Sequence, residues 1–180
     1  MVTKISNGRI VSPDGVLTGY SLYFENGKIL DISKEEYPFD FEIDAENHYV
    51  APGFIDVHVH GGGGFDFMDG GADAIVQAAN FHLQTGTTSI MPTSLACSFD
   101  TLTDFLKDLR MAQSAEKLMG TILGAHLEGP YFAKSQAGAQ NPDYITPPKP
   151  EDYQKILKEF GDLIWVYDEE NPPEMLPGAE

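Results

Sequence analysis

From residue 53 onward the sequence alternates between two hydrophobic periods, and this alternation constrains the fold more than any other feature. Runs such as "GFIDVHVH" and "TTSIMPTSL" are typical of strands, whereas "DTLTDFLKDLRMAQSAEKLMG" repeats its apolar residues at helical spacing. The pattern predicts strands over 53–60, 87–95, 121–128 and 162–170, and helices over 72–86, 100–120 and 150–160. Strands that alternate with helices in this way favour a parallel sheet, so we expect an α/β fold.

Residues 1–51 have a different pattern and predict a separate, small β module. Short strand-like runs are broken by turn residues. Asn26-Gly27 separates two of these runs, and both residues tolerate the positive φ angles of a type I′ turn. We therefore expect a β hairpin at Asn26-Gly27, and a second domain over residues 52–180 that contains three to four βα units.

The strand predicted over 53–60 carries two histidines on one face. Side chains of a strand alternate, so His58 and His60 lie on one side, and Val57 and Val59 lie on the other. We expect the β-branched side to pack against helices, and the polar side to need a partner, because buried imidazoles without one are costly. Two imidazoles at the carboxyl end of a parallel strand fit a divalent metal. The alternative is a pair of hydrogen-bonded core histidines.

Four glycines, Gly61 to Gly64, follow the histidines directly. Because they have no side chains, we expect this loop to let the backbone and a substrate approach the ion closely. A flexible turn is the other interpretation of the same four residues.

A second polar face follows in "GAHLEGPYF", where alternation places His126 and Glu128 on one side of the third strand. Gly129-Pro130 ends that strand, so Glu128 is expected at the same sheet edge as His58 and His60. With the two histidines beside it, we expect Glu128 to be a metal ligand rather than a salt-bridged acid. His126, one layer deeper, is predicted to support the ligands or to be a structural residue, rather than to bind the ion itself.

Charge and cysteine content exclude several kinds of partner and site. The chain has 11 basic and 28 acidic residues and a net charge of −17, which would repel nucleic acid or an anionic membrane, so neither is an expected partner. The single cysteine, Cys97, permits no intrachain disulfide and is predicted to be a packed thiol. No signal-peptide or membrane-spanning pattern is recognisable, and we expect a cytoplasmic location.

Three motifs, "APGFIDVHVHGGGG", "HLEGPYF" and "GAQNPDYI", resemble those of the N-acetylglucosamine-6-phosphate deacetylases, in the metal-dependent amidohydrolase superfamily. The resemblance implies that an amino-sugar phosphate, N-acetylglucosamine 6-phosphate, is hydrolysed to glucosamine 6-phosphate and acetate. It implies one or two divalent ions, zinc or iron, with Glu128 as a principal ligand and His58 and His60 at a second position. It further implies that Ala139 and Gln140 contact the substrate, and that the full-length protein is a homodimer. Many relatives have histidine where this chain has Gln140.

The resemblance also implies a (β/α)8 barrel of the TIM type, which needs about 250 residues. Because the alternation begins near residue 53, we expect an incomplete barrel that forms the N-terminal part of the enzyme. Two further metal-binding histidines, the catalytic aspartate and the phosphate-binding residues are then expected beyond residue 180. The 180 residues alone are predicted to be inactive.

Two other functions fit the first motif. Dihydroorotase-like or hydantoinase-like enzymes, which open cyclic amides, also carry H-x-H, but they typically bridge two metals with a modified lysine on the fourth strand, and "DLIWVYDEE" has no lysine. The second alternative is a short, non-catalytic binding module that retains part of the barrel. Its open sheet edge would require a partner.

Overall fold

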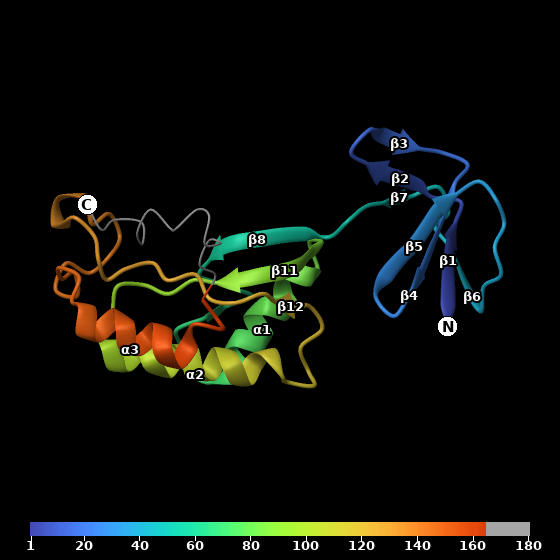
Figure 1. Cartoon of the computed structure of the whole chain (residues 1–180). Coiled ribbons are helices and arrows are strands. Elements are labelled where there is room, and N and C mark those ends of the chain that lie inside the picture. The colour runs from blue at the N-terminus through green and yellow to red at the C-terminus, as the bar shows by residue number, and fades with distance from the viewer. Residues whose placement is uncertain (165–180) are drawn as a thin grey trace. The chain divides into compact units, whose positions relative to one another are not determined.

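The computed structural model describes residues 1–164. The chain divides into two compact units, Met1–Pro52 and a second unit that begins at Gly53 (Figure 1). Each unit has its own sheets and its own buried side chains. Within residues 1–164, no helix combines the length and the apolar character needed to cross a bilayer.

The first unit consists of two β-sheets. A four-stranded sheet has the order β5-β4-β1-β6, and a three-stranded sheet has the order β3-β2-β7. Neighbouring strands are antiparallel, except that β6 is parallel to β1 and β7 is parallel to β2. The strand bounds are β1 Val2–Ser6, β2 Arg9–Ser12, β3 Gly15–Leu17, β4 Ser21–Glu25, β5 Lys28–Ser33, β6 Phe41–Asp44 and β7 Tyr49–Val50.

The turn between β4 and β5 has the predicted conformation. Asn26 has a φ of 49° and Gly27 a φ of 75°, so both residues occupy the left-handed region that a type I′ turn requires. On either side of the turn the two strands pair antiparallel, with Glu25 opposite Lys28. The hairpin prediction is confirmed.

The second unit has an α/β fold in which strands and helices alternate. Three parallel strands form a sheet of order β12-β11-β8, and three helices lie together on one side of it (Figure 1). The elements are β8 Phe54–Val59, β9 Gly61–Gly62, β10 Phe65–Asp66, α1 Ala72–Leu83, β11 Thr87–Pro92, α2 Phe99–Gln113, β12 Thr121–Ile122, the 3-10 helix η1 Lys134–Gln136 and α3 Pro150–Phe160. The parallel sheet predicted from the alternation is confirmed.

Helix α2 ends at Gln113, not at the predicted Gly120. The segment that follows the helix bonds to a residue far away in the sequence. Asn80 of α1 donates its side-chain amide to the carbonyl of Lys117 at 2.8 Å and accepts a hydrogen bond from the backbone N–H of Met119 at 2.9 Å. These two bonds hold residues 117–119 against α1, outside the helix. Hydrophobic spacing alone does not reveal such a contact.

The third strand is less regular than the predicted strand over 121–128. Beyond β12, Ala125 forms a bridge to Ile164 and His126 forms a bridge to Thr93, so this segment pairs with neighbours on both sides. Of the predicted fourth strand, 162–170, only the first three residues lie within the described part of the chain.

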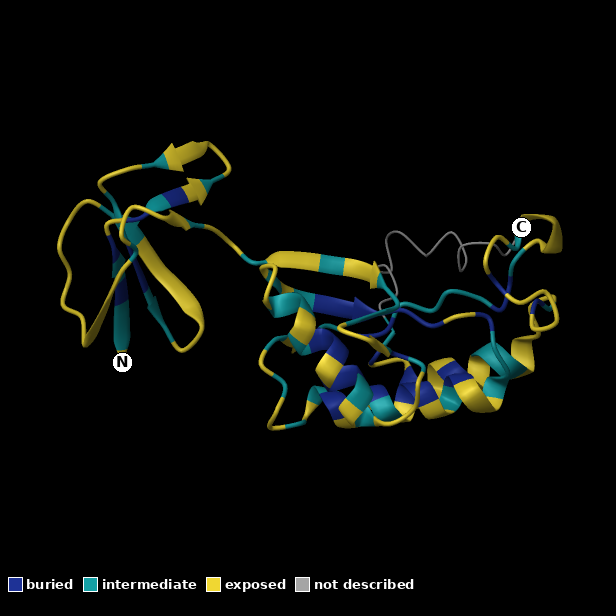
Figure 2. Cartoon of the chain, turned by 180° about the vertical axis from the view of Figure 1, so that it is seen from behind, coloured by how far each residue is buried: buried dark blue, intermediate teal, exposed yellow. Residues whose placement is uncertain are grey.

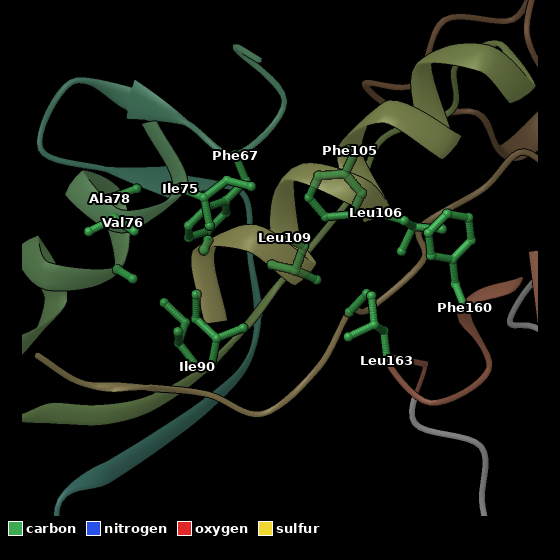
Figure 3. Close-up of a cluster of buried hydrophobic side chains, with 14 of the residues drawn as sticks. Phe67, Ile75, Val76, Ala78, Ile90, Phe105, Leu106, Leu109, Phe160 and Leu163 are labelled. Carbon is green, nitrogen blue, oxygen red and sulfur yellow. The ribbon is translucent and has the colours of Figure 1, made fainter. Parts of the chain in front are cut away.

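The core of the second unit lies between its helices and its sheet (Figure 3). Leu106 and Leu109 of α2 are fully buried, and Ile75 of α1, Ile90 of β11 and Phe160 of α3 belong to the same cluster. Complete burial of a leucine or isoleucine side chain contributes about 1.5–3 kcal/mol. Because all three helices and β11 meet in one cluster, the helices support the sheet whose strand ends carry the predicted ligands.

β8 departs from the prediction that its β-branched side packs against helices. Ile55 is 63% exposed and Val57 is 56% exposed, whereas Val59 packs against the core. Figure 2 shows β8 as a largely exposed strand. Among the described strands β8 neighbours only β11, and α1 and α2 pack against β11 and β12 instead. The prediction was wrong for Ile55 and Val57 because they belong to an edge strand that these helices do not reach.

Candidate metal centre

The three predicted ligands meet at the carboxyl end of the parallel sheet. The Nε2 atom of His58 lies 2.8 Å from Oε2 of Glu128, and Nε2 of His60 lies 3.0 Å from the same oxygen. One ligating atom from each side chain lies within 4.8 Å of those of the other two. Two imidazole nitrogens and a carboxylate oxygen form a donor set that suits zinc and iron. The residues therefore fit a divalent ion.

The sheet topology brings together residues that are 70 positions apart. β8 and β12 flank β11, so the segments that leave them end at one edge of the sheet. His58 lies in β8, His60 follows its last residue, and Glu128 follows the extended segment after β12. Ala125 and Leu127 pack on the core, so Glu128 points to the opposite side, as alternation predicted.

Thr93, at the end of β11, orients His60. The Nδ1 atom of His60 lies 3.3 Å from the carbonyl oxygen of Thr93. Because a carbonyl only accepts, Nδ1 carries the proton in this bond, and a neutral ring then has its lone pair on Nε2, the atom that faces Glu128. Thr93 is fully buried, and its hydroxyl oxygen accepts a hydrogen bond from the backbone N–H of Val59 at 3.0 Å. One residue thus fixes both the strand end and the ring.

Ser94, the second residue after β11, holds Glu128. Its hydroxyl oxygen accepts a hydrogen bond from the backbone N–H of Glu128 at 3.1 Å, and its own backbone N–H donates to the carbonyl of His126 at 3.0 Å. Ser94 is fully buried. Sequence reasoning missed Thr93 and Ser94, although two small hydroxyl residues at the end of a buried strand were an available signal.

The surroundings of Glu128 keep it ionised. Burial raises the pKa of this carboxyl, but hydrogen bonds from His58 and Gln140 and charge interactions with the two histidines together outweigh burial and lower the pKa below its usual value. A lowered pKa keeps the side chain anionic as the pH falls. Glu128 therefore offers a negative charge to a cation over the neutral and mildly acidic range.

His126 lies beside His58 rather than among the three ligating groups. The two ring centroids are 4.6 Å apart, and Nδ1 of His126 lies 3.3 Å from the hydroxyl oxygen of Thr93. Burial, the nearby charge of His58 and a smaller effect of His60 lower the pKa of His126, although Glu128 acts in the opposite direction. This arrangement agrees with a supporting role.

The two residues expected to contact substrate lie in different environments. Ala139 is exposed. Gln140 is 8% exposed, and its amide donates from Nε2 to Oε1 of Glu128 at 2.9 Å and accepts at Oε1 from the backbone N–H of Ala96 at 2.7 Å. The structure thus brings Gln140 to Glu128, one of the candidate metal ligands. Contact of Ala139 and Gln140 with substrate stays a prediction.

The glycines after His60 have a packing role that the sequence did not indicate. Gly61–Gly62 and Phe65–Asp66 pair as the short hairpin β9–β10, which packs against α1. A Cβ atom on Gly61 would lie 2.2 Å from the carbonyl oxygen of Phe65, and one on Gly62 would lie 2.6 Å from Nε2 of His82. Side chains at these positions would clash within the hairpin or with α1, so the structure accounts for them without a substrate.

Sequence comparison places this site in a known context. A model of the amidohydrolase family matches residues 49–172. The chain is 34% identical over 163 residues to N-acetylglucosamine-6-phosphate deacetylase of Bacillus subtilis, and this alignment covers 87% of this chain and 41% of that relative. It is 35% identical over 138 residues to N-acetylgalactosamine-6-phosphate deacetylase of Escherichia coli, and this alignment covers 75% of this chain and 35% of that relative.

A solved structure shares the fold. The crystal structure of N-acetylglucosamine-6-phosphate deacetylase from Pasteurella multocida matches with a TM-score of 0.81 and 28% identity, over 91% of this chain and 43% of that chain. The chain thus spans less than half the length of these relatives. His58, His60 and Glu128 all lie within the region that the family model matches. The chain belongs to the amidohydrolase family.

Proposed function

We propose that these 180 residues form the N-terminal part of a metal-dependent hydrolase that removes the acetyl group from an N-acetylated amino-sugar phosphate. N-acetylglucosamine 6-phosphate is the first candidate substrate, with glucosamine 6-phosphate and acetate as products. The cluster of His58, His60 and Glu128 carries the proposal, because it lies in a chain that is 34% identical to a deacetylase for that substrate.

The proposed cofactor is zinc or iron, in one or two positions. A bound ion would polarise the acetamide carbonyl and lower the pKa of a water molecule. Glu128 contributes negative charge, His60 contributes a nitrogen held in place by Thr93, and His58 contributes the most exposed of the three side chains, at 52%. The general base, two further metal-binding histidines and the phosphate-binding residues are expected beyond residue 180, so the described residues supply only part of the ion site.

We also propose that the second unit is the first part of a (β/α)8 barrel. Its parallel strands follow one another in space in the order of the sequence, with helices on one side, as successive strands of a barrel do. The candidate ligands lie at the carboxyl ends of these strands, where barrel enzymes have their active sites. Closure would place a further strand beside the edge of β8 and a further helix over Ile55 and Val57.

A second substrate is favoured by a specific observation. The relative with 35% identity is named for N-acetylgalactosamine 6-phosphate, the epimer of the first candidate. Both sugars carry the same acetamide and phosphate, so the same ion-binding residues serve either reaction. Cyclic-amide hydrolysis and a non-catalytic binding module are the remaining alternatives.

The test is acetate release by the full-length protein purified with zinc or with iron. We expect turnover of one or both amino-sugar phosphates, loss of turnover on chelation, and recovery when the metal is returned. Turnover of a cyclic amide alone would overturn the proposal. A stop codon directly after residue 180 would favour the binding module. The 180 residues alone are expected to bind the ion without releasing acetate.

Two further properties are proposed for the whole protein. A cytoplasmic location agrees with a single cysteine, because disulfide-rich chains belong to oxidising compartments. A homodimer is proposed from the family resemblance, and sedimentation of the full-length protein tests it. The net charge of −17 argues against nucleic acid or an anionic membrane as a partner.

A further inference from the structure

The side chain of Gln140 connects the candidate metal centre to the loop after β11. Ala96, in that loop, lies 44 positions before Gln140 and donates its backbone N–H to Oε1 of the amide at 2.7 Å. Glu128 lies 12 positions before Gln140 and accepts a hydrogen bond from Nε2 at 2.9 Å. Because Gln140 is 8% exposed, little of this side chain is available to solvent.

The orientation of this amide follows from the chemistry of its two neighbours. A backbone N–H only donates, so the amide oxygen of Gln140 must face Ala96 and its NH2 group must face Glu128. If the amide were flipped, its NH2 group would face the N–H donor of Ala96, and its oxygen would face the carboxylate acceptor of Glu128. Gln140 is therefore fixed as a donor to Glu128.

This bond gives the two oxygens of Glu128 different roles. Oε1 accepts from Gln140, while Oε2 lies 2.8 Å from Nε2 of His58 and 3.0 Å from Nε2 of His60. The backbone N–H of Glu128 is held by Ser94 at 3.1 Å. With its backbone and one oxygen fixed, Glu128 presents the other oxygen toward the two histidines.

We propose that Gln140 is a positioning residue that orients Glu128 to offer one oxygen, Oε2, to the metal ion. This inference rests on the proposed metal site and assigns Gln140 a role that does not involve the substrate. An amide does not titrate in the physiological range, so its bond to Glu128 persists as the pH changes. Replacing a residue that holds a metal ligand in this way typically weakens metal binding by about 10–100-fold.

Two variants distinguish the effect of the hydrogen-bond donor of Gln140 from the effect of its side-chain volume. Gln140→Met keeps nearly the same length and removes both polar ends. Gln140→Glu keeps an acceptor for Ala96 but replaces the donor with a second carboxylate beside Glu128. Gln136, an exposed residue of η1 in the same segment, provides the matched control Gln136→Met.

The experiment measures zinc dissociation constants of the full-length protein and its variants by competition with a chromophoric chelator. We expect both variants at position 140 to bind zinc about 10–100-fold more weakly, and Gln136→Met to bind like the wild type. The visible absorption of the cobalt-substituted chain reports ligand geometry, and we expect it to change only in the variants at position 140. Thermal unfolding establishes that each variant is folded.

A folded Gln140→Glu chain with wild-type zinc affinity and an unchanged cobalt spectrum would show that Gln140 does not position Glu128. If the wild type and Gln136→Met also bind no zinc, the proposed metal site is wrong, and the role of Gln140 is wrong with it. The two failures are distinguishable because only the second affects the wild type.

Discussion

At the scale of single residues, one carboxylate is shared by two imidazoles. Glu128 is the anionic member of the three candidate ligands, and its Oε2 atom faces both His58 and His60. Ser94 and Gln140 fix its backbone and its other oxygen. Glu128 therefore supplies the negative charge of the candidate site from a side chain that is fixed in place, which makes it the most informative residue to change.

The variant Glu128→Gln is expected to lose tightly bound metal, because the amide has nearly the same shape but no negative charge. We expect zinc affinity to fall by at least about 100-fold, the upper end of the effect for residues that only support a ligand. Elemental analysis after dialysis measures the loss, and circular dichroism should show little change in folding. Glu116→Gln, at an exposed position, is the control. Stoichiometric zinc in Glu128→Gln would identify Glu128 as a structural acid.

Cys97 provides a test of burial near the site. The thiol packs against the core, and burial raises its pKa to about 11 because the thiolate is poorly solvated there. Alkylation of the folded chain by iodoacetamide should therefore be slow near neutral pH and rise about tenfold per pH unit until the pH approaches that pKa. As the single cysteine, Cys97 gives an unambiguous signal. A reaction profile of the folded chain that matches the denatured chain would contradict this expectation.

The grouping of the three candidate ligands at one sheet edge could be predicted from the sequence, whereas the residues that orient them could not. Strand alternation alone places His58 and His60 on one face and turns Glu128 toward the same edge. Thr93 and Ser94 act through hydrogen bonds to residues 34 positions away, and no local pattern contains that information.

At the scale of elements, α2 is the helix on which the core of the second unit depends. Leu106 and Leu109 lie on its buried side, in contact with the cluster that includes α1, α3 and β11. Ser98 caps its first turn by accepting a hydrogen bond from the backbone N–H of Thr101 at 3.1 Å. Met111, on the same helix, is 56% exposed.

We expect Leu109→Ala to destabilise the second unit by about 2–5 kcal/mol, because it leaves a cavity in a closely packed core. Met111→Ala should change stability by less than about 0.5 kcal/mol, since it lies outside that core. Denaturant unfolding followed by far-ultraviolet circular dichroism measures both values, because the helices of the described residues all belong to this unit. Equal effects of the two substitutions would contradict the described core.

The bounds of an element were well predicted where the spacing of its apolar residues was clear along its whole length. α3 spans Pro150–Phe160, the range that its spacing indicated. α2 was predicted to extend to Gly120, whereas it ends at Gln113 and Lys117 and Met119 bond to Asn80 of α1, a contact that hydrophobic spacing does not contain. Ile55 in β8 was predicted to pack against a helix but is exposed. The identity of a β-branched residue does not show whether a helix covers it.

At the scale of the whole molecule, a bound ion would link the ends of separate βα units. Saturation with zinc at 100 times its dissociation constant should stabilise the second unit by about 2.7 kcal/mol, or about 5–10 °C in its melting temperature. Calorimetry with zinc and with chelator tests this expectation, and Glu128→Gln should show no shift. A zinc shift that persists in Glu128→Gln would place the binding elsewhere.

The register of β8 on β11 also limits how the chain can change length during evolution. Asp56 lies opposite Ile90 and Val59 lies opposite Pro92, with an irregularity between these pairs at which three steps of β8 run beside two of β11. Because a strand repeats every two residues, loss or gain of one residue within β8 would turn His58 and His60 to the opposite face and bring valines to the rim. The segment between η1 and α3 contains no strand, so insertions there leave this register intact. Descendants of this sequence should therefore vary in length at residues 142–149 and keep the spacing from Phe54 to His60.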